Sequence, residues 1–101
     1  MVFVTVPGLK EGRRISKEIL TSRLAACVTV VPDVRSMYWW EGKIVRASEA
    51  MLLVKTTKIQ YQKLERKIME LHPYQVPEII AIPLVEGLPQ YLGWIKREAV
   101  N

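Results

Sequence analysis

Three segments of the chain carry apolar side chains at nearly every successive position, and this feature constrains the fold more than any other. The segments are residues 27–31, 51–54 and 79–82, and they are rich in Val, Ile and Leu. Such residues favour β-strands, in which successive side chains point to opposite faces of the sheet. Both faces of the sheet are therefore expected to be buried, whereas a free-standing antiparallel sheet usually keeps one polar face.

The hydrophobic patterns and turn residues divide the chain into seven elements. Strands are predicted over residues 1–6, 25–40, 44–57 and 77–85, and helices over residues 9–23, 57–72 and 90–99. Pro32 and Asp33 predict a bulge or kink in the second strand. Thr57 opens a capping box at the start of the second helix, and Pro73 requires that helix to end by His72.

The resulting order is βαββαβ followed by a terminal helix. This order predicts an α+β fold, a ferredoxin-like βαββαβ sandwich, as a single domain over residues 1–101. In this arrangement the two internal helices cover one face of the sheet and leave the other face open. Because the strands are apolar on both faces, the open face is expected to be covered by another copy of the chain. The alternative is that the terminal helix folds back over it.

Composition excludes several classes of partner. The chain has 15 Lys and Arg against 10 Asp and Glu, a net charge of +5. The basic residues are dispersed without a block of five or six, which is typical of a solvated surface and not of a nucleic-acid site. The aromatic octapeptide that RNA-recognition domains use to stack bases is absent. No apolar stretch approaches the roughly 20 residues that span a bilayer, so neither nucleic acid nor membrane is expected as a partner.

The same composition gives expectations about location and stability. The one cysteine, Cys27, cannot form an internal disulfide, which favours a reducing compartment. The chain begins with a strand pattern and not with an export signal, so a cytoplasmic location is predicted. One Asn beside many Lys, Arg and Glu residues is typical of heat-adapted proteins, and a thermostable protein is expected.

The sequence offers little for catalysis. It has no Gly-rich phosphate loop, no nucleophile elbow and a single histidine, His72. Cys27 lies in an apolar strand, where a free cysteine usually behaves as a small buried hydrophobe, and Glu49 and Glu78 have no spacing that forces them together. An enzyme is therefore not predicted. His72 is either a helix cap or a metal ligand, since in an oligomer His72 and Cys27 recur in each subunit and both suit copper and zinc.

Five strings of the sequence resemble the CutA family of divalent-cation-tolerance proteins in order and spacing. They are LAACV at 24–28, SMYWWEGKI at 36–44, VKT at 54–56, HPYQVPEI at 72–79 and YLGW at 91–94. The resemblance implies a cytoplasmic homotrimer in which long bent hairpins pair between ferredoxin-like subunits, as in PII-type signalling trimers. It implies no catalytic activity and no required cofactor, with copper or other divalent cations as possible ligands.

The resemblance also implies that the characteristic residues of the family gather in clefts between subunits. In this chain they are Cys27, Trp40, Glu49, Lys55, His72, Tyr74 and Glu78. One hypothesis is a trimer that binds copper or another divalent ion through His72, with Cys27 or a carboxylate. A second is a PII-like module that binds a small anionic ligand or a partner protein, with Lys55 as the charge and Trp40 and Tyr74 as apolar walls. In a third, these residues serve only assembly and stability.

Overall fold

The computed structural model describes residues 1–101 and contains four strands and three helices. The strands are β1 (Val2–Val6), β2 (Cys27–Trp40), β3 (Lys43–Lys55) and β4 (Ile79–Ala81). The helices are α1 (Leu9–Thr21), α2 (Tyr61–Leu71) and α3 (Pro89–Glu98). The predicted βαββαβ order with a terminal helix is confirmed. No helix combines the length and the apolar character that crossing a membrane requires.

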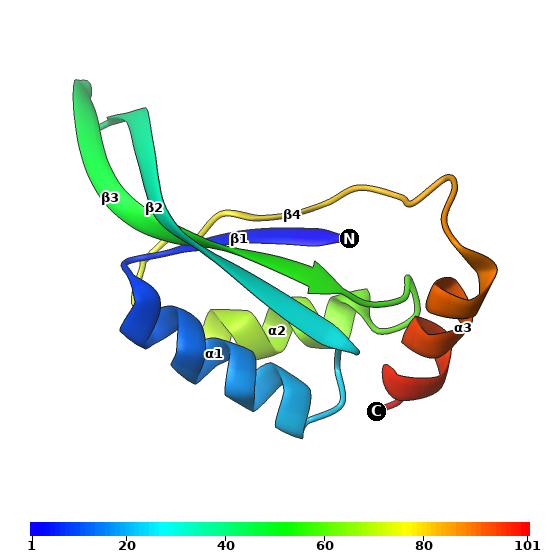
Figure 1. Cartoon of the computed structure of the whole chain (residues 1–101). Coiled ribbons are helices and arrows are strands. Elements are labelled where there is room, and N and C mark those ends of the chain that lie inside the picture. Colours follow the sequence, from blue (N-terminus) through cyan, green and yellow to red (C-terminus); the bar gives the residue numbers. More distant parts are fainter.

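The four strands form one antiparallel sheet in the order β2-β3-β1-β4. Helices α1 and α2 pack side by side against one face of this sheet (Figure 1). Strands β2 and β3 are adjacent in sequence and pair along most of their length as a hairpin. Strands β1 and β4 are distant in sequence but pair directly, because α1 connects β1 to β2 and α2 connects β3 to β4. This is the ferredoxin-like α+β fold that the sequence predicts.

The core lies between the sheet and the two covering helices. Val4 and Val30 both pair with Leu52, so these three side chains form one row that faces the helices. The fully buried helix residues that meet this row are Ile15, Ile19, Leu64 and Ile68. Their spacing of three and four residues places each pair on the inner side of its helix, as the sequence pattern predicts.

The β2–β3 hairpin is long and bent, and it projects beyond the helices (Figure 1). Its register breaks between Val31 and Val34, where Asp33 adopts a φ of 57°. The predicted irregularity at Pro32-Asp33 is therefore confirmed. At the tip, Glu41 and Gly42 both have positive φ values, as a tight two-residue hairpin turn requires.

The second face of the sheet is open in the single chain. Leu53 pairs with Phe3 and Phe3 pairs with Ile80, so their side chains form an apolar row on the face opposite the helices. Ile80 is 55% exposed. Helix α3 lies beyond one end of the sheet and does not cover this row (Figure 1). The alternative prediction, in which the terminal helix folds back over the open face, is therefore wrong.

Two predictions about element ends are wrong. The fourth strand was expected over residues 77–85, but β4 spans only Ile79–Ala81, because Pro83 has no N–H with which to extend the ladder. The capping box at Thr57 does not form: the Thr57 carbonyl accepts the Gln60 N–H in a turn, and α2 begins at Tyr61. The Gln60 side chain is buried and makes no cap hydrogen bond, so it cannot reach back as the motif requires.

Candidate functional site

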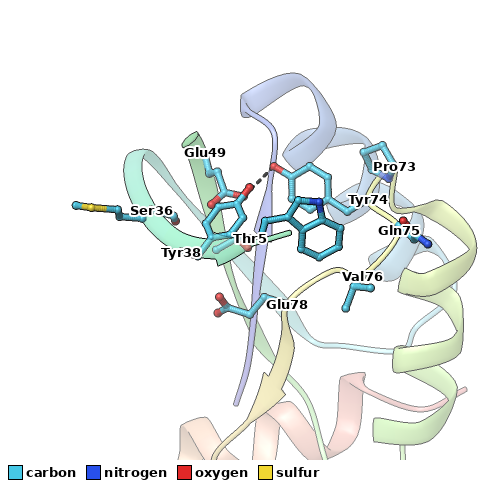
Figure 2. A pocket seen from close by; sticks show the side chains of 11 residues that line it. Thr5, Ser36, Tyr38, Glu49, Pro73, Tyr74, Gln75, Val76 and Glu78 are labelled. Atoms are coloured by element: carbon cyan, nitrogen blue, oxygen red, sulfur yellow. Dashed lines mark hydrogen bonds between the residues drawn. The ribbon is translucent and has the colours of Figure 1, made fainter. Parts of the chain in front are cut away.

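A pocket of about 770 Å³ opens beside the bend of the hairpin. Its walls come from β1, β2, β3 and the segment that follows α2 (Figure 2). Four predicted cleft residues line it: Trp40, Glu49, Tyr74 and Glu78. Its size is that of a small-molecule site. The hairpin bend therefore brings together most of the residues that the resemblance selected.

Glu49 and Tyr74 form the polar centre of this pocket. Glu49 is only 6% exposed, and its Oε2 accepts a 2.8 Å hydrogen bond from the Tyr74 hydroxyl (Figure 2). Burial, together with this hydrogen bond and the nearby Glu49 charge, raises the pKa of Tyr74 above its ordinary value. Tyr74 therefore stays a neutral donor that fixes the orientation of the carboxylate.

His72 lies directly behind this pair and is 8% exposed. Its Nδ1 accepts a 3.1 Å hydrogen bond from the Tyr74 N–H, and its Nε2 lies 2.7 Å from the Thr5 carbonyl oxygen. Because Nδ1 is an acceptor, we assign the ring proton to Nε2, which donates to Thr5. The imidazole also packs against the Tyr74 ring at 4.7 Å between centroids. His72 thus joins the segment after α2 to strand β1.

These contacts bear on the metal hypothesis. A histidine coordinates a metal through a free ring lone pair, whereas both ring nitrogens of His72 are engaged within the chain. No group of three or more His, Cys, Asp or Glu side chains gathers anywhere in the chain. Within one chain, therefore, no cluster of such side chains marks a metal site.

Cys27 and Lys55 lie apart from the pocket. They pair with each other at the end of the β2–β3 ladder farthest from the hairpin turn. The Lys55 Nζ donates to the Thr29 hydroxyl at 2.5 Å and lies 3.9 Å from the Cys27 Sγ. Within one chain the predicted cleft residues therefore fall into two groups, and Lys55 could join Trp40 and Tyr74 only from a neighbouring subunit.

The sequence matches the model of the CutA1 family, described as CutA1 divalent ion tolerance protein, over residues 1–98. The chain belongs to the CutA family. A divalent-cation tolerance protein CutA from Thermus thermophilus is 46% identical over 96% of this chain and 94% of its own length. A rice chloroplast CutA is 42% identical, but this chain spans only 55% of that protein. The resemblance inferred from the five sequence strings is confirmed.

Solved structures agree with the family assignment. The Thermus thermophilus CutA1 structure matches with a TM-score of 0.94 and 45% identity, covering 96% of this chain and 94% of that one. A Nostoc protein described as PII-like protein CutA, in apo form, matches at 0.91 and 30% identity, covering 98% and 95%. The CutA fold with PII-like relatives is therefore shown. A cytoplasmic location stays a prediction, and the Archaeoglobus fulgidus relative is described as periplasmic.

Sequence reasoning missed two features of this CutA pocket. Tyr38 and Ser36 also line it, and the two-residue period of β2 from Trp40 could have found them. The negative charge of the pocket lining was also missed. The only ionisable acids or bases among the lining residues, apart from tyrosines, are Glu49 and Glu78.

Proposed function

We propose that this CutA family member is a homotrimeric, PII-like module that binds a small ligand in the pocket at the hairpin bend. The observation that carries the ligand-binding role is the buried Glu49 carboxylate, held by Tyr74 at the centre of a cavity of about 770 Å³. A buried charge is costly to keep, and its place in a pocket wall is typical of a recognition site.

The trimer is supported by the apolar surface that one chain leaves open. The row through Leu53, Phe3 and Ile80 has no cover within the chain. The projecting hairpin also exposes Trp39, at 72%, and Ile44 on the paired strand. Exposed apolar surface of this kind usually marks an interface. A threefold arrangement is what the CutA resemblance implies, and the PII-like Nostoc relative is consistent with it.

Assembly is tested by placing a charge on the open face. Ile80→Lys is expected to dissociate the trimer, because the Lys ammonium would be desolvated in the interface. Met69→Lys is the matched control, since Met69 is similarly exposed, at 51%, but lies on the outer side of α2. Sedimentation equilibrium at low micromolar concentration measures the mass. A wild-type chain that sediments as a monomer contradicts the assembly, as does an Ile80→Lys variant that stays trimeric.

Ligand binding is tested by amide NMR shifts on the trimer with a panel of small cations, neutral alcohols and carboxylates. Shifts centred on Glu49, Tyr74 and Trp40 are expected for at least one member of the panel. Shifts confined to the surface of α1 or α2, or no shifts at all, contradict the pocket as the ligand site. Unchanged shifts in a Trp40→Leu variant would also count against it.

A second candidate role is binding of copper or another divalent cation by the trimer. The family description and the names of the relatives support it, as does the partly exposed Cys27 thiol, which recurs once per subunit. His72 is the other residue of suitable chemistry, although it would have to give up the Tyr74 N–H bond. Calorimetric titration of the trimer with Cu(II) tests this role. Absence of heat, or equal affinity in Cys27→Ser and His72→Ala, contradicts it.

A further inference from the structure

The pocket at the hairpin bend carries a charge opposite to that of the chain. The whole chain has a net charge of +5, yet no Lys, Arg or His lines the pocket, which contains the carboxylates of Glu49 and Glu78. Of the basic residues around it, Lys43 pairs with Trp40 at the hairpin tip and His72 lies behind Tyr74, while Lys55 is at the far end of the hairpin ladder. A local acidic site on a basic protein favours a positively charged ligand.

The Glu49 carboxylate has one oxygen available for such a ligand. Oε2 accepts the Tyr74 hydroxyl, while Oε1 makes no hydrogen bond within the chain. Because Tyr74 fixes the carboxylate and Glu49 is nine-tenths buried, Oε1 is held in place along the pocket wall. Glu78 is exposed at the same pocket and adds a second negative charge (Figure 2). A charged N–H donor would find a preorganised acceptor here.

The other walls are aromatic and apolar. Tyr38, Trp40 and Tyr74 each present a ring to the pocket, and aromatic faces attract cations through their quadrupole. Met37 and Val76 add apolar surface. A small hydrated metal ion gains little from such walls and would find only two carboxylate side chains, whereas an organic cation can use both the carboxylates and the rings.

We propose that the pocket selects an organic ammonium ion, with its N–H groups on Glu49 and its hydrocarbon part against Trp40 and Tyr38. This inference rests on the proposed small-ligand function and names the chemical class of the ligand. It differs from the anionic ligand of the sequence-based hypothesis, which requires Lys55 of a neighbouring subunit to reach this pocket. The aromatic rings hold the apolar part of the ion, and the fixed carboxylate selects for its charge.

The experiment compares three ligands of one shape: cyclohexylammonium, cyclohexanol and cyclohexanecarboxylate. Each is titrated into the wild-type trimer, with tryptophan fluorescence and amide NMR shifts as readouts. The ammonium ion is expected to bind at least about tenfold more tightly than the alcohol, which corresponds to one charge-assisted hydrogen bond. The carboxylate is expected to bind most weakly, since it meets Glu49 and Glu78.

Variants locate the binding. Glu49→Gln keeps an oxygen for the Tyr74 hydroxyl and is expected to lower affinity for cyclohexylammonium about tenfold, with little effect on cyclohexanol. Glu65→Gln is the matched control, because Glu65 also accepts a 2.8 Å hydrogen bond from a tyrosine, Tyr61, but lies outside the pocket. Trp40→Leu changes an exposed side chain and tests the aromatic contact without reliance on the buried glutamate.

The titrations distinguish the ammonium-ion proposal from the broader ligand-binding proposal. Tighter binding of the ammonium ion that is lost in Glu49→Gln and weakened in Trp40→Leu supports the inference. Equal binding of the three compounds, or preference for the carboxylate, overturns the charge selectivity and leaves the pocket a ligand site. If a folded trimer shows no pocket shifts with any of the three or with the wider panel, the proposed ligand-binding function fails as well.

Discussion

Replacement of His72 separates a structural histidine from a metal ligand. In this structure the imidazole donates to the Thr5 carbonyl and accepts from the Tyr74 N–H. His72→Ala removes both bonds at once. His72→Asn keeps an acceptor near the position of Nδ1, while His72→Gln keeps a donor near the position of Nε2. Wild type therefore holds both of these hydrogen bonds, the Asn and Gln variants hold one each, and the Ala variant holds neither.

The expected loss of stability follows from burial. Thr5 is 5% exposed and lies in the central strand β1, so its carbonyl, once left without the imidazole, costs about 1–3 kcal/mol. The Tyr74 N–H is partly buried and loses a hydrogen bond of about 1 kcal/mol. His72→Ala is therefore expected to lower the free energy of unfolding by about 2–4 kcal/mol. The Asn variant, which loses the Thr5 contact, is expected to lose about 1–3 kcal/mol, and the Gln variant, which loses the Tyr74 N–H bond, about 1 kcal/mol.

Chemical unfolding at one fixed protein concentration is the assay, because subunit association contributes to the measured stability. A parallel copper titration uses the same four proteins. The structural role predicts the stability order wild type, then Asn and Gln, then Ala, with copper affinity following no such order. A His72→Ala protein that keeps full stability but loses copper binding would falsify the structural assignment.

Three further predictions follow from single residues. Gly42→Ala at the hairpin tip is expected to cost about 1 kcal/mol, because Gly42 has a φ of 78°; Gly8→Ala, at an extended residue with free space, should change thermal unfolding little. Leu52→Ala is expected to cost about 2–5 kcal/mol in chemical unfolding, since Leu52 is fully buried. The folded state raises the pKa of Tyr74, so its stabilising contribution is present below the ordinary value of 10.0 and is lost as pH rises above it. As the pH rises into the alkaline range, the Tyr74→Phe variant should therefore lose less stability than wild type does. Its absorbance titration should lack the tyrosine that ionises at the highest pH in wild type.

The fold was largely predictable because its determinants are local. The spacing of Ile15 and Ile19 identifies the inner face of α1. Pro32 and Asp33 mark the register break of β2, since neither suits a regular ladder there. The length of β4 and the start of α2 were missed. Both depend on which backbone groups find partners after folding, which the pattern of side chains does not specify.

The candidate site was only partly predictable because it is assembled by the bend of the hairpin. Glu49 pairs with Val34, directly after the register break, and meets Tyr74 from a segment that is distant in sequence. No local pattern encodes this meeting. The separation of Lys55 from Trp40 was within reach of the sequence, because the turn fixes the hairpin register. Trp40 pairs next to that turn, whereas Lys55 lies roughly 40 Å along the strand at about 3.3 Å per residue.

The contrast between a basic surface and an acidic pocket has a consequence for the salt dependence of binding. Dispersed surface charges are screened over about 8 Å at physiological ionic strength, whereas a buried contact is screened much less. Added salt should weaken the repulsion of the basic surface for an incoming ammonium ion and leave its contact with Glu49 nearly intact. Affinity for cyclohexylammonium is therefore expected to hold or rise slightly between low and moderate salt, as fluorescence titration would measure. A steep fall with salt would place the cation on an exposed carboxylate such as Glu78, and the buried Glu49 contact would then be wrong.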